Sequence, residues 1–156
     1  MKSVQGGQET PALFFRMLAW YGAMLIGFCV IQFTLLAVMN IETSTGALAA
    51  TVLAAMVPGD VYSRRTHQTP SKGFGWGVAI GFALVGLCVS VIQVNWSARL
   101  GSSQAIRLSG DAQFLFLMLF LHLIMIGPLK WAFGWGASIR QRANAEKAAR
   151  TPPTKL

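Results

Sequence analysis

Charged residues are scarce in this chain of 156 residues. They make up 12% of it, and only five of them are acidic, whereas about 25% of an ordinary soluble domain is charged. Long stretches such as 17–39 and 73–94 hold no charged residue at all. An apolar helix of about 20 residues is long enough to cross the roughly 30 Å core of a bilayer. The composition therefore excludes an ordinary soluble domain and predicts an all-α integral membrane protein.

Residues that bind metals or act as nucleophiles are also few. Both cysteines, Cys29 and Cys88, lie inside apolar runs, where a reduced and packed thiol is more usual than a disulfide or a metal pair. Of the two histidines, His67 lies in a polar loop, which argues against a membrane haem held by two histidines. The chain has no CxxC, HExxH, GxSxG or phosphate-binding glycine motif. We therefore expect no catalytic site, no metal and no cofactor.

The middle of each expected span also lacks acidic and basic side chains. Proton-coupled carriers usually need a carboxylate or an ion pair inside the membrane, and small four-span drug exporters depend on such a glutamate. The nearest candidate is Asp60, which lies close to one membrane surface. Arg64 follows four residues later, so an i,i+4 ion pair along one helix is the expected role of Asp60.

Four spans are predicted within a transmembrane domain, 14–139. They are expected at 14–39, 45–62, 73–94 and 114–133, between a disordered tail, 1–13, and a basic cytoplasmic tail, 140–156. The second span is the least apolar, because Pro58, Gly59 and Asp60 interrupt its last turns. Either its helix ends at Val57, or it bends and continues to the membrane surface. The distribution of basic residues favours the second alternative.

Basic residues predict the orientation of the spans. With four spans, 11 of the 13 Lys and Arg residues fall on one side, and only Arg99 and Arg107 fall on the other. Since cytoplasmic loops carry the excess of Lys and Arg, we expect a four-helix antiparallel bundle with both termini in the cytoplasm. A three-span chain would divide the basic residues less cleanly.

Five basic residues of the middle loop and the tail are candidates for fixing topology and for binding anionic lipid headgroups. Each is worth about 1 kcal/mol near an anionic surface. The basic residues cluster beside apolar runs, which favours the lipid bilayer over nucleic acid as the partner. The candidates are Arg64, Arg65, Lys72, Arg140 and Arg142.

Small residues recur at a spacing of four in the first three spans. Such rows allow close approach of helix backbones, and we expect packing within one chain, with self-association as the alternative. The candidates are Ala19, Ala23 and Gly27 in the first span and Gly73, Gly77 and Gly81 in the third. The second span has a similar row of Ala47, Thr51, Ala55 and Gly59.

Three polar residues on three spans are expected at one depth. Counted from the outer ends of their spans, Gln32, Thr51 and His122 lie roughly 9–12 Å inside at 1.5 Å per residue. We expect a hydrogen-bonded layer in the outer half of the bundle. Such a layer either holds helices together, which is the more usual role, or forms a site for a ligand or a proton.

One stretch resembles a family of small uncharacterised four-span bacterial inner-membrane proteins. The resemblance is carried by Ala-Ala-Met at 54–56, Gly59, Tyr-Ser-Arg-Arg-Thr at 62–66 and Thr-Pro-Ser at 69–71. In that family an acidic residue follows the Pro-Ser turn, whereas this chain has Lys72 there. The resemblance implies a bacterial inner-membrane location and no particular chemistry.

These observations favour a non-enzymatic protein that packs against another membrane protein or lipid. The alternative is an oligomeric small transporter or channel component that uses Gln32, Thr51 and His122.

Overall fold

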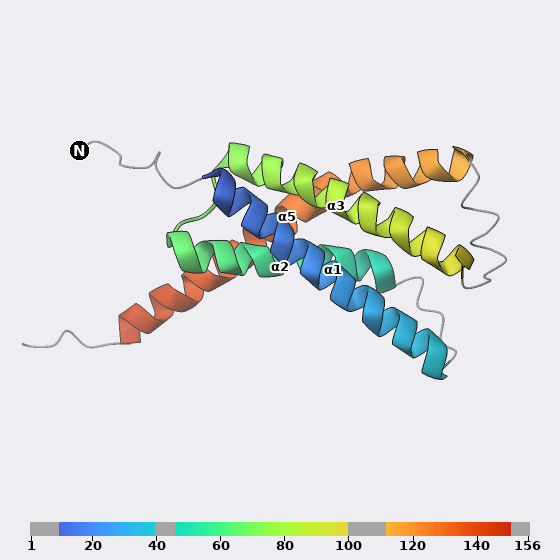
Figure 1. Cartoon of the computed structure of the whole chain (residues 1–156). Helices are drawn as coiled ribbons and strands as arrows, with labels where there is room; N and C mark the ends of the chain where they lie inside the picture. The colour runs from blue at the N-terminus through green and yellow to red at the C-terminus, as the bar shows by residue number, and fades with distance from the viewer. Residues whose placement is uncertain (1–9, 40–45, 100–111, 151–156) are drawn as a thin grey trace, which may run out of the picture.

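The computed structural model describes residues 10–39, 46–99 and 112–150, and within them the chain is helical with no strand. Figure 1 shows the long helices that make up this part of the chain. They are α1 (Pro11–Met39), α2 (Gly46–Thr66), α3 (Lys72–Arg99) and α5 (Ala112–Arg150). The predicted all-α class is confirmed. Of the tail expected to be disordered at 1–13, residues 1–9 lie outside the described residues, whereas 11–13 already belong to α1. Residue 45, where the second span is expected to begin, also lies outside them.

Three of these helices are long and apolar enough to cross a membrane. The qualifying segments are Pro11–Thr34, Lys72–Trp96 and Ala112–Lys147. α2 does not qualify over the residues searched, because its last turns carry Asp60, Arg64 and Arg65. By length and composition the chain is thus membrane-associated, with three candidate spans.

The helix α2 does not end at Val57. It continues through Pro58 to Thr66, and the Arg64 Nε atom lies 2.8 Å from Asp60 Oδ2, which confirms the predicted i,i+4 ion pair. His67 then adopts a left-handed conformation (φ 54°), and its N–H donates to the Ser63 carbonyl at 3.0 Å. Such a bond is a common way to end a helix.

The helix α3 begins at a capping serine. The Ser71 hydroxyl accepts a hydrogen bond from the Phe74 N–H at 3.2 Å, which satisfies one of the free donors in the first turn. At the other end of the described chain, α5 continues to Arg150. The first residues of the expected basic tail are therefore helical, as the i,i+4 pairs of Arg142, Glu146 and Arg150 indicate.

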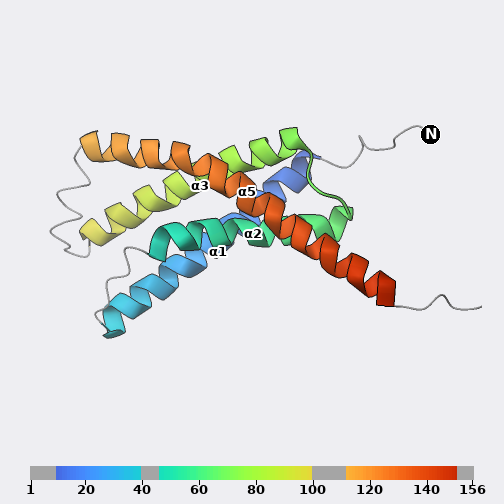
Figure 2. The ribbon, with the colours of Figure 1, turned by 180° about the vertical axis from the view of Figure 1, so that it is seen from behind.

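Chain direction alternates along the sequence, but close neighbours are not all antiparallel. α1 and α3 run one way, and α2 and α5 run the other (Figures 1 and 2). α1 and α5 each pack against both α2 and α3, so that α2 and α3 lie at opposite corners. The start of α1 and the end of α5 lie at the same end of the bundle. We call this end the near end and the opposite one the far end.

This arrangement differs from a simple antiparallel bundle, in which each helix packs against the next one along the chain. α2 and α3 are joined by a short connection but do not form a main helix pair. The reason is a backbone contact between α2 and α5. A Cβ atom on Gly59 would overlap the Phe133 carbonyl, and a Cβ atom on Gly136 would overlap the Met56 carbonyl. Each helix thus presents a glycine to the other's backbone.

Aromatic rings fill the core beside this contact. Tyr21 of α1 stacks on Phe82 of α3, with ring centroids 4.2 Å apart. Phe82 meets Phe133 of α5 edge to face at 5.9 Å, and Phe133 meets Tyr62 of α2 at 5.8 Å. These four rings are at most 2% exposed. All four helices therefore contribute to one core.

The rows of small residues differ in where they face. Ala19, Ala23 and Gly27 lie on the exposed face of α1, and nothing lies within 4 Å of a Cβ atom built on Gly27. The expectation that this row packs within the chain is therefore corrected. The larger side chains of Met17 and Tyr21 occupy the buried face instead, since they fill the space between α1 and its neighbours.

On α3 the row divides. A Cβ atom on Gly81 would lie 2.6 Å from Leu18 Cδ2, and one on Gly77 would lie 3.9 Å from the Phe14 ring, so both glycines face α1. Gly73 is exposed and has open space around it. On α2, Ala55 is buried and Gly59 contacts α5, whereas the side chain of Ala47 lies outside the described set.

We expect Gly59→Ala and Gly136→Ala each to destabilise the bundle by about 1–3 kcal/mol, because the added methyl group must displace a backbone carbonyl. The midpoint of thermal unfolding in detergent, followed by loss of the monodisperse gel-filtration peak, measures this. Gly73→Ala is the matched control, since its methyl group enters open space. If Gly59→Ala unfolded at the temperature of the control, the contact would not be the close one described.

Candidate functional site

Polar side chains from all four helices surround one cavity toward the far end of the bundle. The cavity has a volume of about 70 Å³ and is partly enclosed. A space of this size with several polar partners can hold a few water molecules. Its polar lining consists of Cys29 and Gln32 from α1, Thr51 from α2, Ser90 and Gln93 from α3, and His122 from α5.

Helical periodicity explains why α1 and α3 supply most of this lining. On α1 the lining residues are 25, 28, 29 and 32, and on α3 they are 86, 89, 90 and 93. Both sets follow the i, i+3, i+4, i+7 spacing that places residues on one face of a helix. The polar members occupy the same two places in each set, so that the two parallel helices present matching polar faces.

His122 reaches the cavity past a glycine. A Cβ atom on Gly86 would lie 3.3 Å from His122 Cδ2, closer than most side chains tolerate. His122 Nδ1 lies 2.8 Å from the Met118 carbonyl, and because a carbonyl only accepts, Nδ1 carries the proton. In the neutral ring Nε2 is then the acceptor. Ser90 Oγ approaches Nε2 at 3.5 Å, at the limit of a hydrogen bond.

A buried tyrosine hydroxyl lies beside the same glycine. A Cβ atom built on Gly86 would lie 3.4 Å from His122 Nε2 and 3.6 Å from the Tyr21 hydroxyl oxygen. Both groups therefore face the same side of Gly86. That hydroxyl is buried and has no hydrogen-bond partner within the described chain. Since buried hydroxyls are normally satisfied, the Tyr21 hydroxyl is a further donor available close to the ring of His122.

A long contact between α1 and α3 crosses the cavity. The Cys29 thiol donates to Gln93 Oε1 over 3.7 Å, and Gln32 contributes its amide to the lining. The eleven lining residues include no Asp, Glu, Lys or Arg. The cavity therefore offers hydrogen-bond donors and acceptors without a fixed charge, which suits water or an uncharged polar solute better than an ion.

The structure brings Gln32, Thr51 and His122 together around this one cavity. The ring of His122 contacts Met118 and Ser90. The three predicted residues therefore line a cavity together with other polar residues. The prediction from sequence missed Cys29, Ser90 and Gln93. Their spacing of three on each helix, at 29 and 32 and at 90 and 93, is the signal that could have found them.

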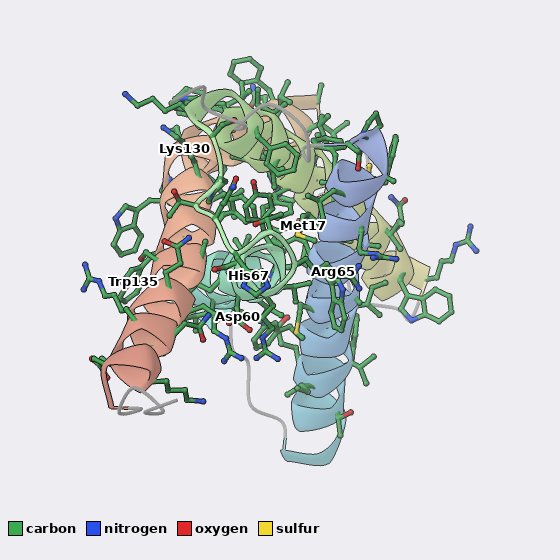
Figure 3. All side chains as sticks on the ribbon, turned by 90° about the vertical axis from the view of Figure 1, so that its left-hand side faces the viewer. Met17, Asp60, Arg65, His67, Lys130 and Trp135 are labelled. Carbon is green, nitrogen blue, oxygen red and sulfur yellow. The ribbon has the colours of Figure 1, made fainter. Side chains whose placement is uncertain are left out.

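The predicted basic residues lie toward the near end and divide into two groups. Arg64 pairs with Asp60, and Arg140 Nε of α5 lies 3.8 Å from the other carboxylate oxygen. Asp60 therefore lies between a cation on α2 and one on α5. In the view of Figure 3, Asp60 lies between α5 and α1. The second group, Arg65, Lys72 and Arg142, is exposed.

Metal ligation has no structural support in the parts of the chain that are placed. No group of three or more His, Cys, Asp and Glu side chains gathers there in a way that could hold a metal ion.

Replacing Gln32 with leucine separates the two roles that the polar level could have. If Gln32 serves only the cavity, we expect Gln32→Leu to change the free energy of unfolding by less than about 0.5 kcal/mol or to raise it, because leucine loses no bond between helices and fills part of the cavity. If Gln32 joins helices through a hydrogen bond, the loss averages about 0.6 kcal/mol and can reach about 1.7. The Ser90→Ala variant, which removes a hydroxyl next to His122, serves as the comparison for the loss of a polar group from the same cavity. Reversible unfolding in mixed micelles measures both.

No protein-family model, curated protein or solved structure matches this chain. The resemblance seen at 54–71 stays a prediction, and the function is argued from the geometry of the cavity.

Proposed function

We propose that the chain is a non-enzymatic, four-span protein of the bacterial cytoplasmic membrane, with both termini in the cytoplasm, and that its cavity binds a small uncharged polar solute or water. In this role it serves as an oligomeric small transporter or channel component. The observation that carries the proposal is the contribution of a polar side chain by each of the four helices to one cavity. One of these side chains, His122, is ionisable, and an ionisable side chain inside a membrane bundle is by default a candidate for a functional site.

The proposed fourth span is α2. Its 21 residues extend about 31 Å at 1.5 Å per residue, which matches the core of a bilayer. α2 packs against both α1 and α5, and its residues Ala54, Ala55 and Gly59 are buried. A helix largely covered by other helices needs less hydrophobicity than one surrounded by lipid, so its alanine-rich composition is compatible with a span.

The orientation rests on charge and on the arrangement of the helices. The described ends of the chain and the 67–71 connection share the near end of the bundle, and the predicted cytoplasmic cluster of basic residues lies there. Arg65, Lys72 and Arg142 are exposed at that end and would face anionic lipid headgroups. The cavity would then lie in the outer half of the membrane.

A reporter fused after Lys155 and another inserted beside Arg99 test this topology. We expect a cytoplasmic reporter to be active after Lys155 and inactive beside Arg99, because the positive-inside rule holds the basic near end in the cytoplasm. A periplasmic reporter should give the reverse pattern. Opposite results at Lys155 would overturn the proposed orientation.

The chemistry of the cavity indicates the class of solute. His122 Nε2 and the two glutamine amides can accept hydrogen bonds, and the amides and hydroxyls can donate them. The aromatic core formed by Tyr21, Phe82 and Phe133 fills the bundle on the near side of the cavity. A solute would therefore enter from the far end, and passage would require these rings to move apart.

The two native cysteines provide a direct test of water access. Cys29 lines the cavity, whereas Cys88 is exposed on the outside of the bundle and would face lipid. In spheroplasts treated with Ag⁺ from outside, we expect Cys29 in the Cys88→Ser protein to bind Ag⁺, because silver ions are soft and small and reach thiols only through water. Loss of later maleimide labelling, after the protein is denatured, measures this binding.

The Cys29→Ser protein, which retains Cys88, is the matched control and should keep its maleimide labelling. If Cys29 stayed as reactive toward maleimide as the control, the cavity would be closed to water and the transport role would fail. That outcome would favour the other role expected from sequence, a packing partner of another membrane protein or lipid. The exposed row of Ala19, Ala23 and Gly27 on α1 is the surface that such a partner would use.

A further inference from the structure

A groove with tryptophan walls runs along the outer side of the bundle where α3 and α5 meet. Its volume is about 450 Å³, and its main lining residues are Trp76 of α3 and Lys130, Trp131, Gly134 and Trp135 of α5. We call it the tryptophan groove. Figure 3 shows Lys130 and Trp135 on the side of α5 that faces away from α1. The groove is thus separate from the polar cavity and from the aromatic core.

Lys130 supplies the positive charge of the groove. Its Nζ atom lies 4.1 Å from the centre of the Trp76 ring, in a cation–π contact. The ion pairs of Asp60 with Arg64 and with Arg140 do not include Lys130. The ammonium group is therefore positioned by an aromatic ring while its charge is not neutralised by a carboxylate, and it can donate hydrogen bonds to an anion.

The three tryptophans form an exposed amphipathic wall. Trp131 and Trp135 stack with ring centroids 4.9 Å apart, and Trp131 is 62% exposed. An indole ring offers an apolar face and one N–H donor, which suits the boundary between headgroups and acyl chains. Trp76 lies about 6 Å along α3 from Lys72, at 1.5 Å per residue. This distance is compatible with a position at the boundary between headgroups and acyl chains.

Two glycines keep the groove open. Gly127 and Gly134 lie two turns apart on α5, and nothing lies within 4 Å of a Cβ atom built on either. Because glycine has no side chain, an apolar channel remains beside the tryptophan rings. An extended acyl chain needs such a channel, whereas a folded protein partner would need a broader surface.

We propose that the tryptophan groove binds one anionic phospholipid, with its phosphate at Lys130 and an acyl chain that runs from there past Gly127 toward the far end. The proposal rests on the membrane location proposed above. An anionic headgroup fits better than a zwitterionic one, because the groove holds an unneutralised ammonium and none of its lining residues is a carboxylate that could receive a lipid amine. Basic pockets between helices on the cytoplasmic side bind such headgroups in other membrane proteins.

Native mass spectrometry tests the proposal on the full chain, reconstituted with equal amounts of phosphatidylglycerol and phosphatidylcholine of the same acyl chains. We expect one retained phosphatidylglycerol per chain. Lys130→Gln should lower its retention by about fivefold, the effect of one basic residue near a membrane surface. Lys147→Gln, which removes an exposed lysine of α5 outside the groove, is the matched control and should retain the lipid.

A second variant separates the groove from charge alone. Trp131→Leu keeps Lys130 but removes half of the ring stack, and we expect it to lower retention as well. Equal retention of the two lipids, unchanged retention in Lys130→Gln, or equal loss in Lys147→Gln would each overturn the proposal. Resistance to carbonate extraction is measured on the same proteins. A chain that stays embedded but retains no phosphatidylglycerol rejects only the groove, whereas a chain extracted by carbonate rejects the membrane proposal too.

Discussion

The contact between the backbones of α2 and α5 is the constraint on which the rest of the structure depends. Gly59 and Gly136 each occupy a position where a methyl group would overlap a carbonyl of the other helix. Close approach of this kind draws α2 onto α5 and away from α3, although α3 follows α2 directly in the sequence. It also brings Asp60 of α2 near Arg140 of α5, so that the two helices share an electrostatic contact next to the steric one.

The difference between the two ends of the bundle follows from the contact between α2 and α5. Near the glycine contact, the space between helices is filled by the rings of Tyr21, Phe82 and Phe133. Toward the far end the helices diverge (Figure 1), and smaller polar side chains leave a cavity. A tightly packed half and a hollow half thus lie along one bundle. Rigid packing in the first half is what allows the second half to keep polar groups without collapsing around them.

Much of this organisation could be predicted from the sequence. Long uncharged runs predicted the helices, the i,i+4 spacing predicted the pair of Asp60 and Arg64, and depth counting predicted that Gln32, Thr51 and His122 share a level. The side of α1 that is buried could not be predicted, because both of its faces are apolar and the row of Ala19, Ala23 and Gly27 resembles a packing face. The role of Gly136 depends on the approach of α2, a tertiary event that leaves no local pattern.

The shared contact of α2 and α5 also has a consequence for biosynthesis. α2 is synthesised before α3, but its glycine face has no partner until α5 has been made. In a membrane, a weakly apolar helix with Asp60, Arg64 and Arg65 at its end would be held poorly by lipid alone. If α2 is the fourth span proposed above, its stable insertion would be completed only when the last helix arrives, and the helices would not fold in the order in which they leave the ribosome.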